Sequence, residues 1–477
     1  MKAFNRTWIM GFAALAIAGT AYGQQPSTND TSDNGANTGA GTLALHNLYN
    51  LPPGGRYNTA FGTEALMGAS NFSASFNVAV GYLALGSDET GSWNSASGHA
   101  ALSSNTTGNY NTAAGGIALG SNTGGNYNTA SGYEALLQNT TGGENTAVGA
   151  EALLSNTTGN ANTASGYDAL ASNTTGVDNT ASGYQALASN TTGSDNIATG
   201  YGVLDSNLDG YSNTASGWEA MYFNTHGYDN TASGYGALYL NDSGHHNTAF
   251  GTDALYSING INSTGVGAGT LFNSTTGNNN IALGYDAGYK LTTGSDNIHI
   301  GNEGAAADNK VIKIGTKGSQ TKTYIAGIYT NTAVSGLAVV IGANGELGAV
   351  ASSERFKTDI ARMGTSTEKL QQLRPVTFHY KNDQQRELRY GLIAEEVASV
   401  YPELAIRDEN GRIDGVRYDE LAPMLLNEVQ QQQKKMAAQD QRSAAQDAKI
   451  GQLMEQLVAM HAALDKLQSK DELVAKR

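Results

Sequence analysis

The chain of 477 residues contains no cysteine, only 6 prolines and a low share of charged residues, 14%. The lack of cysteine excludes a disulfide framework and any thiolate metal site. No proline occurs between residues 54 and 374. That gap fits a sheet whose strands donate backbone hydrogen bonds to one another, because proline has no N–H to donate. Stability must therefore come from hydrogen-bonded ladders, packing or oligomerisation.

Charge is divided unevenly along the chain, which has a formal net charge of −15. Residues 24–350 carry 22 acidic and 6 basic side chains, whereas residues 351–477 carry 20 and 19. Nucleic-acid binding needs basic patches that neutralise phosphates, so the acidic part argues against it. We expect this charge mainly to keep the protein soluble.

The first 23 residues have the pattern of a secretory signal peptide. Lys2 and Arg6 precede an apolar stretch at 8–18, and Ala21 and Gly23 are the small residues of a cleavage site. No other stretch is long and apolar enough to span a membrane. We expect export, a mature chain without a transmembrane segment, and an extracellular or cell-surface location.

Glycine is abundant, with 60 residues, and it takes part in an internal repeat of 17 residues. The unit that starts at Asn162 reads NTASGYDALASNTTGVD. Its fifth position is glycine in every regular copy, its eighth is alanine except at Val203, and its ninth is leucine except at Met221. A looser copy starts at Asn58. The asparagine that opens each copy recurs at positions 77, 94, 111, 128, 145, 162, 179, 196, 213, 230, 247, 280 and 297.

This repeat predicts a parallel β-solenoid. Short apolar segments alternate with Asn-Thr-Thr-Gly turn signatures, and a coil of this size buries its apolar face only against the next coil. The leucine column would form the core, and the glycine column would permit a tight bend or the close approach of another backbone. A disordered linker rich in glycine, serine and asparagine is the alternative, and the strict period argues against it.

Some columns of the repeat could be interpreted as ligand-binding positions. The sixth position is aromatic in many copies, which indicates either stacking between coils or a platform for sugars or a partner. The threonine columns fit β structure and turns, although they also resemble an ice-binding face. Calcium binding would need a repeated aspartate that the copies lack, and we expect no metal and no cofactor.

The motif Asn-Thr-Ala-x-Gly-x-x-Ala-Leu, repeated over residues 58–302, resembles the head repeats of trimeric autotransporter adhesins and related surface fibres. The resemblance implies three chains that wind side by side, each a left-handed solenoid, and hence a homotrimer. It does not identify a ligand, so a host or surface glycan or protein that binds the repeats stays open. After Gly301 the period breaks, and strand-like segments at 309–315, 323–328, 337–341 and 346–350 predict a β-rich neck.

Residues 351–360, ASSERFKTDI, resemble the opening of the intramolecular chaperone domain called peptidase family S74. That domain is found at the end of phage tail spikes and endosialidases and also in a membrane-anchored transcription factor. The segments YGLIAEEV at 390–397 and YPEL at 401–404 resemble its second hallmark. The resemblance implies that Ser352 is a nucleophile, that Lys357 is its general base, and that the bond between Ala351 and Ser352 is cleaved.

The chemistry of such a pair is plausible, because a serine hydroxyl becomes a good nucleophile when a base takes its proton. A lysine is a base only when neutral, which burial or a nearby cation such as Arg355 favours. Ser353 is a rival nucleophile, although its spacing to Lys357 is one residue short. Glu395 departs from the Gln or His common in the family, and its carboxylate could either orient Lys357 or keep it protonated.

From Ala422 a heptad pattern continues to the end of the chain and predicts a coiled coil with a polar middle. A helical hairpin within one chain is the alternative. One column comprises Ala422, Val429, Met436, Ser443, Ile450, Leu457 and Leu464, and the other comprises Leu425, Gln432, Gln439, Gln446, Leu453, Met460 and Leu467.

We therefore predict a mainly β, trimeric solenoid followed by an α+β chaperone domain and a long coiled-coil helix. The expected boundaries are a signal peptide at 1–23, a linker or cap at 24–57, the solenoid at 58–302, the neck at 303–351, the chaperone domain at 352–420 and the coiled coil at 421–477. The predicted function is a surface fibre whose chaperone drives trimerisation and then cuts itself off, with no activity on other substrates. The alternatives are an uncleaved structural adhesin and, more weakly, a trimeric enzyme or glycan-binding fibre.

Overall fold

The computed structural model describes residues 36–46, 55–68, 73–325, 339–342, 345–349, 352–408 and 410–474, with side chains up to residue 470. The predicted signal peptide, most of the predicted linker, Ala351 and part of the neck lie outside these residues. The chain divides into two compact units, Met1–Ile325 and Ala326–Arg477. Each unit is described by itself.

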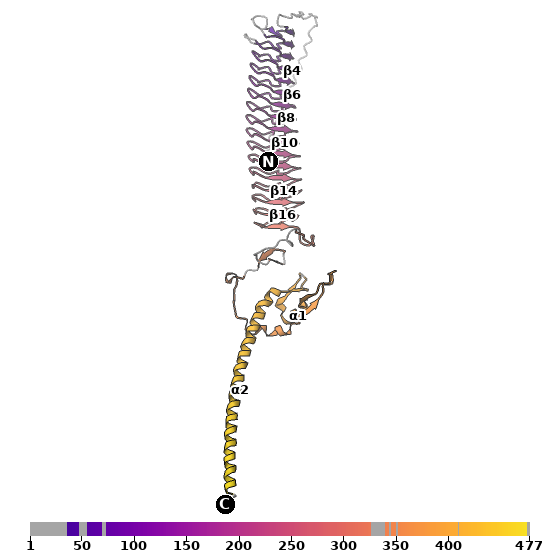
Figure 1. The fold of residues 1–477 in the computed structure, drawn as a ribbon. Helices are drawn as coiled ribbons and strands as arrows, with labels where there is room; N and C mark the ends of the chain where they lie inside the picture. Colours follow the sequence, from indigo (N-terminus) through magenta and orange to yellow (C-terminus); the bar gives the residue numbers. More distant parts are fainter. Residues whose placement is uncertain are drawn as a thin grey trace, which may run out of the picture. The chain divides into compact units, whose positions relative to one another are not determined.

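The first unit is a stack of short coils that each contribute one three-residue strand to a single 17-stranded sheet (Figure 1). This confirms the predicted β-solenoid. The strands are β1 (Thr38–Ala40), β2 (Thr59–Phe61), β3 (Val78–Val80), β4 (Ser95–Ser97), β5 (Thr112–Ala114), β6 (Thr129–Ser131), β7 (Thr146–Val148), β8 (Thr163–Ser165), β9 (Thr180–Ser182), β10 (Ile197–Thr199), β11 (Thr214–Ser216), β12 (Thr231–Ser233), β13 (Thr248–Phe250), β14 (Thr264–Val266), β15 (Ile281–Leu283), β16 (Ile298–Ile300) and β17 (Ile312–Ile314).

Each strand pairs in parallel with the strands of the coils before and after it, in register along the repeat. Thr163 lies opposite Thr180, for example, and Ser165 lies opposite Ser182. The sheet extends by one strand beyond each end of the predicted range of 58–302, through β1 and β17. The repeat pattern misses these two strands because the connections next to them depart from the 17-residue spacing.

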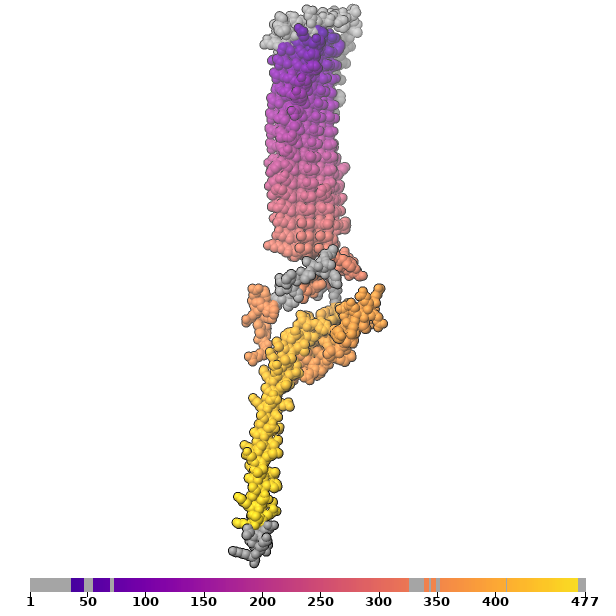
Figure 2. Space-filling view, viewed as in Figure 1, coloured from indigo at the N-terminus to yellow at the C-terminus, as the bar shows by residue number. Residues whose placement is uncertain are grey.

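The leucine column forms the core, as predicted, and the alanine column is buried beside it. Leu170 and Ala169 are fully buried, as are their counterparts in the other regular coils. Glycine is required at the fifth position, where Gly166 has a φ of +140° and a Cβ atom would overlap the carbonyl group of Gly183 in the next coil. The column therefore combines a backbone conformation that favours glycine with a close approach between coils. Figure 2 shows the coils packed closely on one another.

Two ladders of buried asparagines run through the core. In the first, the backbone N–H of Asn94 donates to Oδ1 of Asn77 at 2.8 Å, and Asn94 Nδ2 donates to the carbonyl of Gly108 at 2.8 Å. In the second, made by the twelfth position, Asn122 Nδ2 donates to Oδ1 of Asn105 at 2.8 Å. Burying an amide costs free energy unless the amide is hydrogen-bonded. The ladders satisfy these amides only when neighbouring coils are in register, so they favour a single register of the stack.

The aromatic column at the sixth position stacks from coil to coil. The ring centroids of Tyr167 and Tyr184 are 5.5 Å apart, those of Tyr184 and Tyr201 are 5.1 Å apart, and those of Tyr201 and Trp218 are 4.4 Å apart. Other columns form further ladders that the sequence pattern did not single out. They include one of Tyr57, Phe76, Trp93, Tyr110 and Tyr127, one of Tyr222, Tyr239, Tyr256, Phe272 and Tyr289, and a shorter one of Tyr211, Tyr228 and His245.

The last coils replace the small core residues by a cluster of His299, Asp308 and Lys313. His299 is fully buried in the middle of β16, where most other strands have alanine, and its Nε2 lies 3.0 Å from Asp308 Oδ2. Lys313, in the middle of β17, donates to both oxygens of Asp308 at 2.6 Å. An ion-paired cluster therefore closes the end of the solenoid. It provides polar contacts for the last coil, on which no further coil is stacked.

The second unit begins with a hairpin that forms part of the predicted neck. Its strands, β18 (Val339–Ile341) and β19 (Leu347–Ala349), pair antiparallel across the predicted turn, of which Gly345 is described. The elements that follow are η2 (Glu354–Phe356), η3 (Gly364–Gln372), β20 (Val376–Phe378), β21 (Arg389–Gly391), α1 (Ala394–Val400), η4 (Pro402–Leu404), β22 (Ala405–Arg407), β23 (Ile413–Val416) and α2 (Tyr418–Val474).

A small core holds the middle of this unit together. Val397, Tyr401, Leu404 and Val416 are buried and pack against partly buried residues of η3 and the first turns of α2. Polar contacts add to it, because the Tyr401 hydroxyl donates to the carbonyl of Ser366 at 3.1 Å. The core joins the second hallmark segment to the start of the long helix.

The C-terminal helix α2 is continuous over 57 residues. It begins at Tyr418, three residues before the predicted coiled coil, and it rules out the alternative of a helical hairpin. Its heptad columns are exposed in the single chain, with Leu425 and Leu453 each more than half accessible. Among the described residues, no helix has both the length and the apolar character that a bilayer crossing requires.

Candidate active site

The predicted serine and lysine lie within hydrogen-bond distance of each other. Lys357 Nζ is 3.1 Å from Ser352 Oγ. The short helix η2 brings them together, because the backbone N–H groups of Phe356 and Lys357 donate to the carbonyls of Ser353 and Glu354 at 3.0 Å. One tight turn thus places side chains five residues apart on the same side of the backbone.

The surroundings of this pair are open to solvent. Ser352, Ser353 and Lys357 are all exposed, as is the whole of η2. The guanidinium of Arg355 lies over the ring of Phe356, 4.7 Å from its centroid, in a cation–π contact. Within the described part of the chain, Arg355 therefore contacts Phe356, and Ser353 has no recorded hydrogen bond to Lys357.

Glu395 lies on a different element from the pair. It is exposed in the first turn of α1, and within the described ranges no hydrogen bond or ion pair joins it to Ser352 or Lys357. Its neighbour Glu396 pairs with Arg374 at 2.5 Å, and the hydrogen bond from Arg374 lowers the pKa of Glu396. Among the described residues of the single chain, Glu395 therefore makes no hydrogen bond or ion pair to Lys357, and its predicted influence on Lys357 stays a prediction.

The second hallmark segment has a structural role that its sequence does not reveal. The backbone N–H of Leu392 donates to the hydroxyl oxygen of Tyr418 at 2.8 Å, which links β21 to the first residue of α2. Burial, ahead of weaker hydrogen-bond effects, raises the pKa of Tyr401. Tyr418 therefore ties the start of α2 to Leu392, and Tyr401 belongs to the small core against which Leu421 and Met424 of α2 pack.

A contact between η3 and α2 completes this junction. Glu428 on α2 is buried, and its carboxylate accepts hydrogen bonds from Thr367 at 3.2 Å and from Gln371 at 3.4 Å. Asn427 Nδ2 also donates to Thr367 Oγ1, at 2.7 Å. Sequence analysis missed this cluster, because its members are polar residues more than 50 positions apart.

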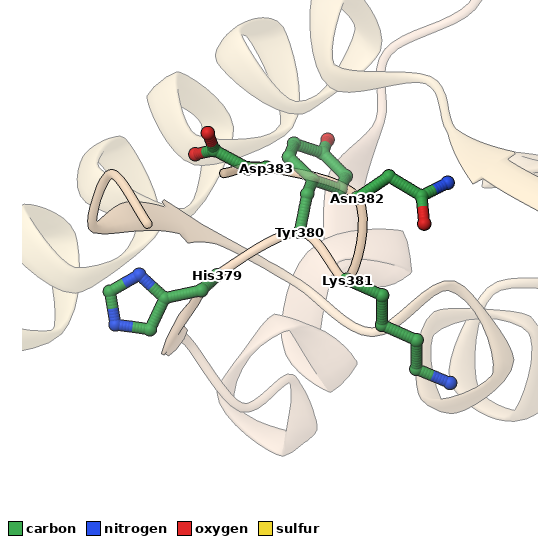
Figure 3. Close-up of a pocket in the computed structure, with 5 residues that line it drawn as sticks. All are labelled: His379, Tyr380, Lys381, Asn382 and Asp383. Carbon is green, nitrogen blue, oxygen red and sulfur yellow. The ribbon is translucent and has the colours of Figure 1, made fainter. Parts of the chain in front are cut away.

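One hollow in the second unit lies apart from the pair. It is lined by the loop residues His379, Tyr380, Lys381, Asn382 and Asp383, whose side chains point in different directions (Figure 3). Five consecutive side chains that diverge do not form a constellation for catalysis or binding. Among the described residues there is also no group of three or more His, Asp or Glu side chains able to hold a metal ion.

Comparison with known families identifies the domain around the pair. Residues 352–406 match the family model Peptidase_S74, described as the chaperone of endosialidase. The match confirms the predicted chaperone domain, and it begins at Ser352. No curated protein and no solved structure matches the chain.

Proposed function

We propose that this protein is a secreted, trimeric surface fibre whose C-terminal chaperone domain directs assembly and then releases itself by cleaving the bond between Ala351 and Ser352. The observation that supports cleavage is the hydrogen bond of 3.1 Å between Lys357 Nζ and Ser352 Oγ, at the first residue of the matched domain. The protease has a single substrate, its own chain.

The reaction follows from the groups in this pair. Lys357 accepts the hydroxyl proton of Ser352 while Oγ attacks the carbonyl carbon of Ala351. The C–N bond breaks, its nitrogen takes the proton back, and an ester joins Ala351 to Ser352 Oγ. Water then hydrolyses the ester and leaves a carboxylate on Ala351 and a free hydroxyl on Ser352, so no co-reactant other than water is needed.

The exposure of the pair links cleavage to assembly. A lysine is a good general base only when it is shielded from water, and in the single chain both Ser352 and Lys357 are exposed. We infer that the neighbouring chains cover the pair in the trimer. Cleavage then occurs only in correctly assembled molecules, after which loss of the nucleating module traps the fibre kinetically.

The trimer has a plausible point of nucleation in α2. The helix carries apolar residues at heptad spacing near both ends, and among them Val429, Leu457 and Leu464 are about half exposed in the single chain. Aligning three solenoids in register is slow because three separate chains must meet with matching coils before they wind. A coiled coil that holds the three C-termini together removes much of that search.

The test is a denaturing gel and intact mass of the exported protein, beside the variants Ser352→Ala, Lys357→Arg and Ser353→Ala. We expect two wild-type fragments that separate after residue 351. Ser352→Ala and Lys357→Arg should stay intact, because the first lacks the nucleophile and the second cannot give up its proton. Ser353→Ala is the matched control and should still be cut.

The second candidate is an uncleaved fibre in which the domain stays as a trimeric base. It is favoured by the open surroundings of Ser352 and Lys357 in the single chain. A single full-length band for the wild type, together with a native mass of three chains, would support this candidate and contradict self-cleavage.

A further inference from the structure

Tyrosines of consecutive coils are stacked on one another at several places, and in two of the described pairs the ring centroids lie less than 5 Å apart. The rings of Tyr110 and Tyr127 are 4.9 Å apart, and their planes differ by 1°. Those of Tyr211 and Tyr228 are 4.8 Å apart, with an angle of 5° between the planes. Tyr127 is 59% exposed and Tyr211 is 45% exposed. Each pair therefore offers two nearly parallel phenol groups to reagents in solution.

The repeat holds the two rings of each pair together. The partners are 17 residues apart and take the same position in neighbouring coils. Backbone hydrogen bonds between the coils fix their spacing. The N–H of Tyr127 donates to the carbonyl of Asn109 at 3.0 Å, and the N–H of Asp229 donates to the carbonyl of Tyr211 at 3.1 Å. Two groups held in this way react far faster than two free groups, because folding has already brought them together.

The composition of the chain indicates which reaction the stacked tyrosines suit. The chain has 24 tyrosines, only 10 phenylalanines and no cysteine. Proteins in an oxidising environment commonly gain covalent cross-links as disulfides, and a chain without cysteine cannot. Phenylalanine would also provide stacking between coils. The phenol group of tyrosine adds a group that one-electron oxidants attack, and the ladders place such groups side by side.

We propose that these stacked pairs are sites of oxidative modification, at which a one-electron oxidant joins the two tyrosines of neighbouring coils into a dityrosine. A peroxidase acting with hydrogen peroxide represents this class of oxidant. The cross-link ties one coil covalently to the next, as a disulfide would. It depends neither on self-cleavage nor on the proposed trimer, because both tyrosines of a pair belong to one chain.

The reaction needs no group other than the two phenols and the oxidant. Each phenol loses one electron and its hydroxyl proton and becomes a phenoxyl radical, whose unpaired electron lies partly on the two Cε atoms. The two radicals combine and form a bond between one Cε atom of each ring. The hydrogen on each of these carbons then moves as a proton to the phenol oxygen, which restores both aromatic rings. Hydrogen peroxide takes up the two electrons and two protons and becomes two water molecules.

The rings must tilt towards each other before they couple, because a carbon–carbon bond is shorter than the spacing of the stack. Exposed side chains change their torsion angles within picoseconds to nanoseconds, so this movement is available to them. Tyr133 provides a contrast within the same solenoid. It is 55% exposed, but its column has Gly116 in the coil before and Ala150 in the coil after. No ring of that column therefore lies beside Tyr133, and we expect it not to couple.

The test is treatment of the exported protein, at high dilution, with a peroxidase and hydrogen peroxide, followed by peptide mapping by mass spectrometry. The variants Tyr127→Phe and Tyr228→Phe keep a ring in the stack but remove one phenol. Tyr133→Phe is the matched control, because it removes an exposed phenol that has no stacked partner. A mixture of chains with two isotope labels distinguishes links within a chain from links between chains.

In the folded wild type we expect a link in each of the two stacked pairs, with the loss of two hydrogen atoms for each link. Tyr127→Phe should lose only the link to Tyr110, and Tyr228→Phe only the link to Tyr211. The link that survives shows that each variant is folded, and Tyr133→Phe should keep both links. Absence of both links from the wild type, while free tyrosine in the same mixture couples, overturns the proposal. It is also overturned if Tyr133 is linked as often as the stacked pairs, or if links form only between chains.

Discussion

Asn122 donates its side-chain N–H to the side-chain oxygen of Asn105, one coil earlier, at 2.8 Å. The same bond recurs from Asn105 to Asn241, so each amide is donor to the coil before it and acceptor from the coil after it. The ladder ends at Asn241, whose Oδ1 has no partner among the described residues because the next coil has Ile258 at this place. A polar column in the core therefore makes each coil depend on its neighbours.

Substitution of one amide should destabilise the stack well beyond its own coil. Asn156→Ala removes the donor to Asn139 and the acceptor for Asn173, both at 2.8 Å and fully buried. We expect a loss of about 3 kcal/mol in unfolding free energy, because buried polar atoms lose their partners and a cavity forms. Chemical denaturation would measure it. Thr158→Ala, an exposed threonine in the same coil, is the control and should change stability by less than about 0.5 kcal/mol.

The glycine column should tolerate no side chain. Gly166→Ala would bring a Cβ atom into the carbonyl of Gly183 while holding a φ of +140°, which an alanine rarely adopts. We expect a loss of at least ~3 kcal/mol or failure to fold. Gly116→Ala is the matched control, since its Cβ would meet only the ring of Tyr133 at 3.5 Å. Equal thermal stability of the two variants would contradict the role assigned to the column.

The N-terminal end of the second ladder should respond to pH through Asp88. This buried carboxyl accepts hydrogen bonds from Asn105 and Asn77, and burial raises its pKa to about 8. Because the folded pKa lies above the unfolded value, the stability that the protonated group contributes is present below about pH 4. It is lost as pH rises towards 8, by up to about 1.4 kcal/mol per pH unit.

The variant Asp88→Asn restores the residue found elsewhere in the ladder and removes the titration. We expect higher stability than the wild type at pH 8, with the difference shrinking as pH falls towards 4. Hydrogen exchange of the coils that contain β3, β4 and β5 would report it, after correction for the intrinsic rate. A difference that is constant across this range would show that the carboxyl does not titrate there.

At the C-terminal end of the solenoid, the dependence of stability on pH is expected to have the opposite sign. Burial alone would raise the pKa of Asp308, but hydrogen bonds from Lys313 and His299 outweigh it and lower the pKa. The stability from this cluster is therefore present above the ordinary pKa, near 4, and is lost as pH falls through the lower folded value.

Removing the charge of Asp308 should reproduce, at neutral pH, the loss of stability that is expected in acid. Asp308→Asn weakens the bonds to Lys313 and to the buried His299, so β17 should detach from β16 more readily. Hydrogen exchange of these two strands at pH 7 would measure it, with Asp296→Asn as the control, because Asp296 lies in the coil border outside the cluster. Equal protection in both variants would contradict the closing role of the cluster.

Much of the candidate site was recognisable before the fold was known, but its surroundings were not. The motif at residues 351–360 identifies Ser352 and Lys357 from the sequence. Their contact could also be expected, because they are five residues apart and a single turn such as η2 is enough to bring them together. The supporting roles predicted for Arg355 and Glu395 stay predictions. In the described single chain Arg355 lies over Phe356 and Glu395 lies on α1, because spacing along a sequence does not determine where a side chain points. The junction of Glu428 with Thr367 was missed for a related reason, because it joins residues far apart in the chain.

The sequence by itself determined the solenoid, because a strict period can be satisfied only when every coil packs on a copy of itself. Gly166 and Leu170 then take the same place in each coil, and their roles could be predicted from one unit. The tertiary structure alone decided the features that depend on how coils are stacked. These are the direction of the Asn122–Asn105 bonds, the buried carboxyl of Asp88 where the second ladder begins, and the ion-paired Asp308 at the C-terminal end of the solenoid. The repeat alone does not predict these features, because each depends on which polar atoms of the neighbouring coil lie within hydrogen-bond distance in the folded stack.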